Sequence, residues 1–295
     1  MTLTCKVCTS KEIEVAGRVH GRLAGRVFDL AHCRTCRHSF VVDPWTAFDR
    51  IYSEAYYRGK GADPYVDYVF ELEHPTYTVR QYEWRGLIRA ISTLVPLSAG
   101  TRWLDFGCGN GGLVRAAREA HIDTVGYDTG WITASASEAG IPLLGPDELA
   151  SAHGFFDVVT AIEVIEHAID PIEMLETIRR LLKPGGVLFM TTGNSRPFRG
   201  RLDTWSYVIP EIHVSFFEPQ TLATALARVG LTPSFPGFVP GFDQIIRYKV
   251  LKNLGVREPQ LWERLLPWPL LARAIDARLA LSAHPVGRRL DVSHE

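Results

Sequence analysis

The chain has no apolar run long enough to cross a membrane, and its first residues, MTLTCKVC, lack the apolar core of a secretory signal. It also lacks an excess of charge, because 32 basic and 33 acidic side chains leave a net charge of −1. A near-neutral chain does not favour non-specific binding to nucleic acid, which needs a basic surface. We therefore expect a cytoplasmic protein with no transmembrane segment and no nucleic-acid partner.

Cysteine is scarce, and four of the five cysteines stand in two CxxC pairs, Cys5 with Cys8 and Cys33 with Cys36. Each pair can place two thiolates on one metal ion, and two pairs complete a tetrahedral zinc site. Because thiolates fill all four positions, such a zinc is structural. We predict a zinc ribbon over residues 1–42, stabilised by its metal because so short a segment has little core. Its predicted strands are residues 12–16, 26–30 and 40–42.

Residues 43–98 are rich in aromatic side chains and are predicted to form a helical lid or linker. Aromatic density of this kind can line a substrate pocket, or it can pack a small lid against the ribbon. The two interpretations stay open at this stage. A helix is predicted over residues 77–95, whose apolar side chains recur near one helical face. The aromatic residues concerned are Phe48, Tyr52, Tyr56, Tyr57, Tyr65, Tyr68 and Phe70.

The stretch TRWLDFGCGNGG, residues 101–112, predicts a buried strand, a tight glycine-rich loop and the start of a helix. Glycines let the backbone close on a flat ligand, and Gly107, Gly109 and Gly112 also satisfy the GxGxxG pattern of dinucleotide-binding proteins. Asp105 at the end of the strand separates the alternatives. A carboxylate there does not stabilise a bound pyrophosphate, whereas it can bind the ammonium group of a ligand.

Strand and helix patterns alternate after this loop. Further strands are predicted at 124–128, 141–144, 155–161 and 187–191, with helices between them. This alternation indicates an α/β fold, a doubly wound Rossmann-like sheet that is mostly parallel. We expect seven strands, with a last one at 242–250. Asp128 ends the second strand about twenty residues past the loop, where an acid can bind a ribose diol.

The motifs DFGCGNG, FDVVTAIEVIEH and LLKPGGVLFM together resemble those of the class I S-adenosylmethionine (SAM) methyltransferases over about residues 87–231. A ribbon ahead of such a domain is similar to bacterial methyltransferases acting on sugars, glycans and other natural products. The resemblance implies that SAM is the cofactor and that Asp128 binds its ribose. The other cofactor-binding residues it implies are Asp105, Gly107, Cys108, Gly109, Gly111, Trp131, Gly145 and Glu163.

Methyl transfer to a hydroxyl requires a group that removes a proton, and His167 and His213 are the candidate bases. Glu163 and Glu166 precede His167 at helical spacing, so the three can share one face. With His213 they resemble the metal site of some 2'-O-methyltransferases of small RNA. Two carboxylates and two imidazoles could hold a second divalent metal. ExxEH also occurs in this superfamily without metal.

We predict a SAM-dependent methyltransferase that acts on a small-molecule, sugar or glycan acceptor, at oxygen, with a histidine base. The alternatives are an RNA methyltransferase with an arginine-rich ribbon as clamp, a non-catalytic SAM-binding scaffold, and, ranked last, an NAD-binding protein. The expected domains are the ribbon, the lid, a SAM-binding domain over 99–240 and a C-terminal extension over 241–295. The leucines and arginines of 262–281 leave three roles open: a helix closing the pocket, a homodimer contact or an interfacial membrane helix.

Overall fold

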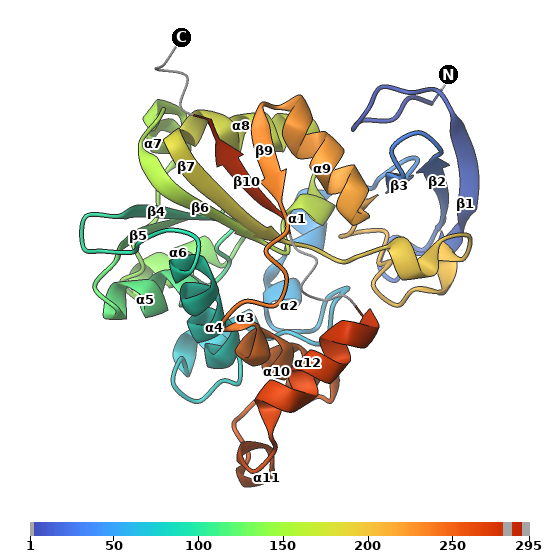
Figure 1. The fold of residues 1–295 in the computed structure, drawn as a ribbon. Coiled ribbons are helices and arrows are strands. Elements are labelled where there is room, and N and C mark those ends of the chain that lie inside the picture. The colour runs from blue at the N-terminus through green and yellow to red at the C-terminus, as the bar shows by residue number, and fades with distance from the viewer. Residues whose placement is uncertain (1–2, 280–284, 291–295) are drawn as a thin grey trace.

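The computed structural model describes residues 3–279 and 285–290 (Figure 1). Its centre is a six-stranded sheet in the order β5-β4-β6-β7-β10-β9. The first four of these strands run parallel, and β10 runs antiparallel to both of its neighbours. The strands are β4 (Arg102–Phe106), β5 (Asp123–Tyr127), β6 (Phe156–Ile162), β7 (Leu182–Thr191), β9 (Leu231–Ser234) and β10 (Val286–Arg289).

The central strands are apolar on both faces because helices cover both. Val158 of β6 points into one core cluster and Val159 into the other, and Phe189 and Leu188 of β7 divide in the same way. This is the burial expected of a parallel sheet between two helical layers. The predicted α/β doubly wound class is confirmed.

One face of the sheet is covered by α7 (Pro146–Ser151), α8 (Pro171–Leu181) and α9 (Pro219–Arg228). The other is covered by α4 (Gln81–Ser92), α5 (Gly112–Glu119) and α10 (Phe242–Asn253). Asp170 begins α8 as predicted, since its carboxylate accepts hydrogen bonds from the amides of Ile172 and Glu173. The remaining helices are α6 (Thr133–Glu138), α11 (Leu261–Arg264) and α12 (Trp268–Leu279).

Two predicted strands differ from the structure. Residues 141–144 meet β5 through one isolated bridge between Leu143 and Gly126, so a seventh strand is not confirmed among the described residues. The prediction of a strand at 242–250 is wrong, because this segment is α10. Its β-branched side chains pack instead in helical register, with Phe242 and Ile245 buried against α4. The last strand of the sheet is β10, from the predicted C-terminal extension, and α10–α12 lie between β9 and β10 in the chain.

The ribbon forms a second, four-stranded sheet in the order β1-β2-β3-β8. Its strands β1 (Ile13–His20), β2 (Val27–Cys33) and β3 (Ser39–Val41) match the predicted segments. The fourth strand, β8 (Ser215–Phe216), comes from the segment that follows β7. The ribbon is therefore paired directly with the larger domain.

The aromatic segment forms α1 (Phe48–Ile51), α2 (Glu54–Tyr57) and α3 (Tyr68–Glu73) between the ribbon and the sheet. Three single-turn 3-10 helices complete the described elements, at Ile165–His167, Arg196–Phe198 and Leu202–Thr204. Within the described residues, no helix combines the length and the apolar character that crossing a bilayer requires.

Candidate functional site

The glycine-rich loop follows β4 and makes a tight turn into α5. Gly111 has a φ of +72°, and a Cβ there would lie 2.4 Å from the side chain of Ile141. At Gly107, with a φ of +77°, a Cβ would lie 2.6 Å from Val164. Both positions therefore require glycine for the backbone conformation and for the close approach of neighbours.

A cavity of about 760 Å³ opens at the carboxyl ends of the parallel strands, next to this loop. In doubly wound sheets, ligands bind at this edge. Seven of the predicted site residues line it: Gly107, Cys108, Gly109, Asp128, Trp131, Glu163 and His167. The other five predicted residues of this region, Asp105, Gly111, Gly145, Glu166 and His213, are not among its lining residues.

Asp128 organises the loop through its carboxylate. One oxygen accepts a hydrogen bond from the amide of Gly109 at 2.8 Å, and the other accepts from the amide of Gly130 at 2.7 Å. Each carboxylate oxygen has a second lone pair. The group can therefore accept hydrogen bonds from a diol in the cavity while it holds the loop in place.

Asp105 lies beneath the loop and not in the cavity wall. It is buried and accepts a hydrogen bond from the hydroxyl of Thr160 at 2.7 Å, and that hydroxyl in turn accepts from the indole of Trp103. Burial raises the pKa of Asp105 to about 7, although the Thr160 hydrogen bond and the charge of Arg80 oppose this. A direct contact between Asp105 and a ligand ammonium stays a prediction.

The aromatic segment provides one wall of the cavity. Its side chains Phe48, Tyr52, Tyr56, Tyr57 and Tyr68 are lining residues. Tyr57 also stacks near Trp131, with ring centroids 6.3 Å apart. Of the two interpretations left open by the sequence, the structure supports a pocket-lining role for these rings.

The cavity is acidic. Four carboxylates line it, those of Asp49, Glu54, Asp128 and Glu163, whereas Arg80 is the only lysine or arginine among its described lining residues. Such a lining suits a ligand with net positive charge and disfavours one with a pyrophosphate.

Glu163 follows β6 with a φ of +55°, an uncommon conformation for a residue that is not glycine. Its side chain is held by three partners: Lys249 of α10 at 2.9 Å, Tyr207 at 2.9 Å and Thr191 at 3.0 Å. Burial lowers the pKa of Lys249, but the combined attraction of Glu163, Glu83 and Glu166 raises it overall. Glu163 therefore lies beside a fixed cation.

Tyr207 links the two glutamates. Its single phenol proton faces a carboxylate oxygen of Glu163 and one of Glu166, while the amide of Gly193 donates to the same phenol oxygen. Burial, and then repulsion from Glu163, raises the pKa of Glu166 to about 8. Glu166 is thus protonated at neutral pH. It can donate to the phenol, and the phenol can donate to Glu163, so every partner is satisfied.

His167 is the histidine at the cavity wall. Its Nδ1 lies 2.9 Å from the hydroxyl of Tyr52, another lining residue. His213 lies behind it, with ring centroids 4.9 Å apart, and its Nδ1 donates to the carbonyl of Tyr207 at 2.6 Å. Burial lowers the pKa of His167 to about 4 and that of His213 to about 3, where repulsion from His167 adds to burial. Both rings are neutral at pH 7.

Donor atoms of Glu166, His167 and His213 lie within 4.8 Å of one another. Glu163, the fourth member of the metal set considered from the sequence, does not belong to this cluster. The oxygens of Glu166 are engaged by Tyr207 and by the hydroxyl of Thr192, which lies 2.8 Å away. A metal ion there would displace several existing hydrogen bonds.

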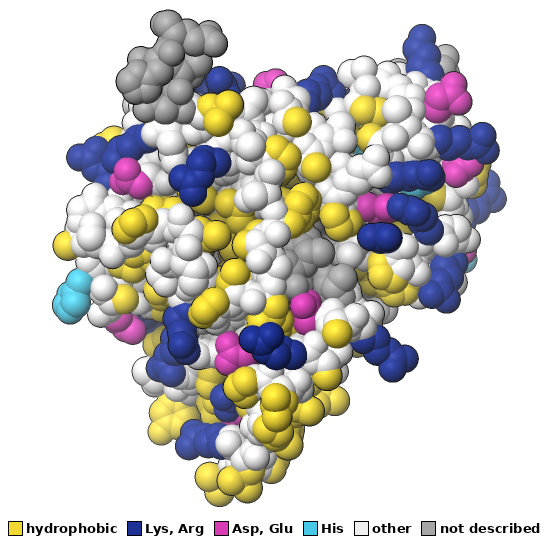
Figure 2. Space-filling view, in the orientation of Figure 1, with side chains coloured by type: hydrophobic (Ala, Val, Ile, Leu, Met, Phe, Trp, Pro, Cys, Tyr) yellow, Lys and Arg dark blue, Asp and Glu magenta, His cyan; other side chains and the backbone are white. Residues whose placement is uncertain are grey.

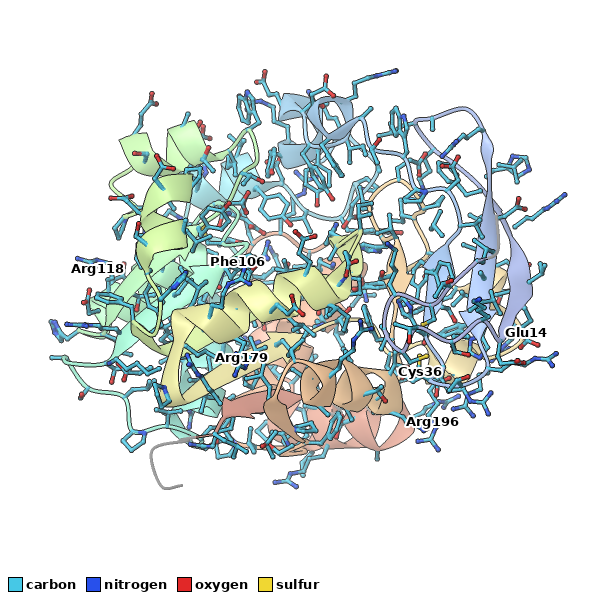
Figure 3. All side chains as sticks on the ribbon, turned by 90° about the horizontal axis from the view of Figure 1, so that it is seen from above. Glu14, Cys36, Phe106, Arg118, Arg179 and Arg196 are labelled. Atoms are coloured by element: carbon cyan, nitrogen blue, oxygen red, sulfur yellow. The ribbon has the colours of Figure 1, made fainter. Side chains whose placement is uncertain are left out.

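The sulfur atoms of Cys5, Cys8, Cys33 and Cys36 also lie within 4.8 Å of one another. The Cys5–Cys36 and Cys8–Cys33 sulfur pairs are each 3.5 Å apart. A tetrahedron with zinc–sulfur bonds of about 2.3 Å has edges of about 3.8 Å, so the cluster fits zinc. Figure 3 shows Cys36 on the ribbon, on the side nearest α9, where its carbonyl accepts from Thr221.

Four residues of the site were not singled out as site residues from the sequence: Tyr52, Arg80, Tyr207 and Lys249. The sequence carried a local signal for two of them: the aromatic richness around Tyr52, and, for Tyr207, the insertion over residues 193–214, where the resembled family often builds its acceptor pocket. Lys249 lies on α10, 86 residues from its partner Glu163, and Tyr207 lies 44 residues from it. Contacts at such separations leave no spacing pattern in the sequence.

Residues 78–233, more than half of the chain, match the family described as a methyltransferase domain. The chain is similar to the ubiquinone biosynthesis O-methyltransferases of Bordetella avium, at 31% identity over 46% of this chain and 64% of that one, and of Cereibacter sphaeroides, at 36% identity over 37% and 47%. These alignments thus span about half to two thirds of the relatives' own length.

The fold is also similar to that of phosphoethanolamine N-methyltransferase 2 of Haemonchus contortus, solved with S-adenosyl-L-methionine. The TM-score is 0.50 at 17% identity, over 85% of this chain and 62% of that one. At this identity the likeness concerns the fold alone. From the family match, we conclude that the chain belongs to the methyltransferase domain family.

Proposed function

We propose that the protein transfers the methyl group of SAM to a hydroxyl of a small-molecule or sugar acceptor, with His167 as the proton acceptor. One observation carries the proposal: the glycine-rich loop, Asp128 and His167 line the same cavity of about 760 Å³. Cofactor-binding groups and a neutral base therefore face one enclosed space. The similarity to O-methyltransferases supports oxygen as the atom methylated.

The acidic cavity suits SAM, which carries a sulfonium and an ammonium against one carboxylate. In this pose Asp128 accepts the ribose hydroxyls, and Trp131 lies beside the adenine. Arg80, which already pairs with Glu71 and Glu83 at 3.1 Å each, faces the carboxylate of the methionine end, and the loop around Gly107 and Gly109 lets the backbone approach. Asp105 supports the loop from below. Gly111 and Gly145 shape the backbone at the starts of α5 and α7.

SAM supplies a carbon already activated by the sulfonium, so the chain has to position the acceptor and remove one proton. We assign that proton to Tyr52 and His167. The acceptor hydroxyl gives its proton to the oxygen of Tyr52, whose own proton moves to Nδ1 of His167. The acceptor oxygen bonds the methyl carbon as the carbon–sulfur bond breaks. The low pKa of His167 keeps its ring neutral at pH 7, so the Nδ1 lone pair is available, and the same burial makes the ring a weak base that passes the proton on after transfer.

In this proposal the remaining acids position His167 and need no second metal. Lys249 already supplies a positive charge to Glu163. Neutral Glu166 and the carbonyl-bound His213 form the support behind the base. The zinc of the ribbon is structural, since its four sulfurs leave no open position.

The RNA-clamp alternative requires free arginines on the ribbon. Arg18 is paired with Asp29, Arg26 with Asp43 and Arg34 with Glu14, at 2.6 to 2.8 Å. The guanidinium of Arg22 donates to the carbonyl of Ala62. Acids thus neutralise three of the five ribbon arginines, Arg18, Arg26 and Arg34, which favours the small-molecule proposal over a clamp built on all five.

The test uses SAM with a labelled methyl group and a panel of catechols, phenols and sugars, with products read by mass. His167→Ala should lower kcat on the best acceptor at least about 100-fold while SAM binding stays within about threefold. Tyr52→Phe, which removes only the relaying hydroxyl, should lower kcat about tenfold. His153→Ala, in an exposed turn, is the matched control. Full turnover by His167→Ala, or SAM binding without transfer to any acceptor, would contradict the proposal.

A further inference from the structure

A cluster of large apolar side chains is exposed around α11, at the end of the molecule opposite the ribbon (Figures 1 and 2). We call it the apolar tip and define it as Leu261, Trp262, Leu265, Leu266 and Leu270. Leu265 is 85% exposed, Leu261 80% and Leu270 70%, while Trp262 and Leu266 are 47% and 38% exposed. A contiguous group of this kind marks an interaction site more often than single exposed leucines do.

The inner side of the tip is firmly anchored. Glu263, between the exposed residues, is fully buried, pairs with Arg247 of α10 and accepts from the phenol of Tyr82 at 2.9 Å. The indole of Trp268 donates to the carbonyl of Glu263 at 2.6 Å. Because a buried polar network fixes the backbone, the apolar side chains are held outward and cannot turn into the core.

Arginines outnumber acids along α11 and α12, the segment that carries the tip. Between Leu261 and Leu279 the chain carries three arginines, Arg264, Arg273 and Arg278, against two acids. One of these acids is Glu263, which Arg247 already neutralises. The arginines are exposed. Apolar side chains with a tryptophan, flanked by arginines, match the chemistry of an anionic bilayer surface, where the rings and leucines enter the acyl boundary and the guanidinium groups meet headgroup phosphates.

A second copy of the chain fits the tip less well. Stable protein interfaces bury about 800 Å² from each partner and use about 20–30 residues on each side, whereas the tip offers five apolar side chains. A two-fold contact through the tip would also bring the arginines of the two copies together, which is repulsive. We propose that the apolar tip docks the protein onto an anionic membrane surface.

The test is sedimentation of the full chain with vesicles of phosphatidylcholine alone and of phosphatidylcholine with phosphatidylglycerol. The wild type should bind the anionic vesicles and bind neutral vesicles at least about tenfold more weakly. Leu261→Ser combined with Leu265→Ser should weaken anionic binding at least about tenfold, because two inserted leucines are lost. Arg264→Gln should weaken it about fivefold on anionic vesicles alone.

The control is Val15→Ser, which removes a side chain that is 83% exposed on the ribbon and should leave vesicle binding unchanged. Unchanged melting temperatures would show that the variants fold. Wild-type protein that stays in the supernatant with both vesicle types would overturn the proposal. So would tip variants that bind like the wild type, or a solution dimer that the double variant dissociates in the absence of vesicle binding.

Discussion

Within the part of the chain that the structure describes, two groups of side chains that could bind a metal each have their donor atoms within 4.8 Å of one another. In the ribbon, the sulfurs contact one another, with the Cys5–Cys36 and Cys8–Cys33 pairs each 3.5 Å apart. Beside the cavity, both oxygens of Glu166 have hydrogen-bond partners, and Nδ1 of each histidine is bound. Proximity is therefore the same in both groups, and the existing hydrogen-bond partners distinguish them.

Among the substitutions that test this comparison, Cys33→Ser is expected to have the largest effect, on zinc content and on stability. Cys33 is fully buried in the same core cluster as Leu175 of α8 and Leu226 of α9. Loss of its thiolate should release the zinc and destabilise the whole chain by on the order of 5 kcal/mol. Zinc content by mass spectrometry and the thermal transition measure this. Cys108→Ser, outside the ribbon, should keep its zinc; a Cys33→Ser protein that retains full zinc would contradict the prediction.

Lys249→Met tests whether a fixed cation takes the place of a metal beside Glu163. The change leaves a half-buried carboxylate without its ion pair at the cavity, so we expect kcat/KM to fall about 10- to 100-fold. Added Mg²⁺ should not restore it. Lys60→Met, at an exposed lysine that does not line the cavity, is the control. Rescue by Mg²⁺ would indicate that a metal can act at this position.

Glu166→Gln tests the proton assigned to Glu166. The folded-state pKa of about 8 lies above the ordinary value of 4.5, so the folded chain binds the extra proton and loses stability as pH rises from 4.5 through 8. Glutamine mimics the neutral acid and has no such loss. The stability of the variant relative to the wild type should therefore increase between pH 5 and 8.5, by about 1–3 kcal/mol. Denaturant titrations at several pH values measure it, and a difference independent of pH would sink the assignment.

The smallest expected effect is that of a chelator on methyl transfer. At a concentration that leaves the ribbon zinc in place, the rate should change by less than about twofold, because the proposed proton path uses Tyr52 and His167 alone. The rate and the zinc content are measured on the same sample. Loss of transfer with zinc retained would make the Glu166, His167 and His213 cluster a working metal site.

The parts predicted correctly from the sequence depend on neighbours in the chain. The turn at Gly107–Gly111, the cap at Asp170 and the paired cysteines each carry a local pattern. The prediction of a strand at 242–250 was wrong because Ile245, Ile246 and Val250 favour strands, whereas packing against α4 stabilises a helix there. Strand β10 is short and half of it is arginine, so its place in the sheet depends on β7 and β9.

The candidate site divides in the same way. The glycine-rich loop and the position of Asp128 beside it were predicted because they belong to consecutive strand–loop–helix units. The hydrogen bonds that hold Glu163 were not predicted, because its partners Tyr207 and Lys249 lie in a loop and a helix much later in the chain. The pKa shifts of Glu166, His167 and His213 are caused mainly by burial, which cannot be predicted from a sequence pattern.

The position of β10 has a consequence for how the chain is made. Among the described strands, β9 pairs with β10 alone, and β10 joins it to β7. A ribosome releases β9 well before β10, with α10, α11 and α12 synthesised in between. During that interval β9 has no partner in the sheet, and the edge of β7 is open. The nascent protein therefore exposes a strand edge until β10 has been synthesised, and during this interval a chaperone that covers such edges would matter most.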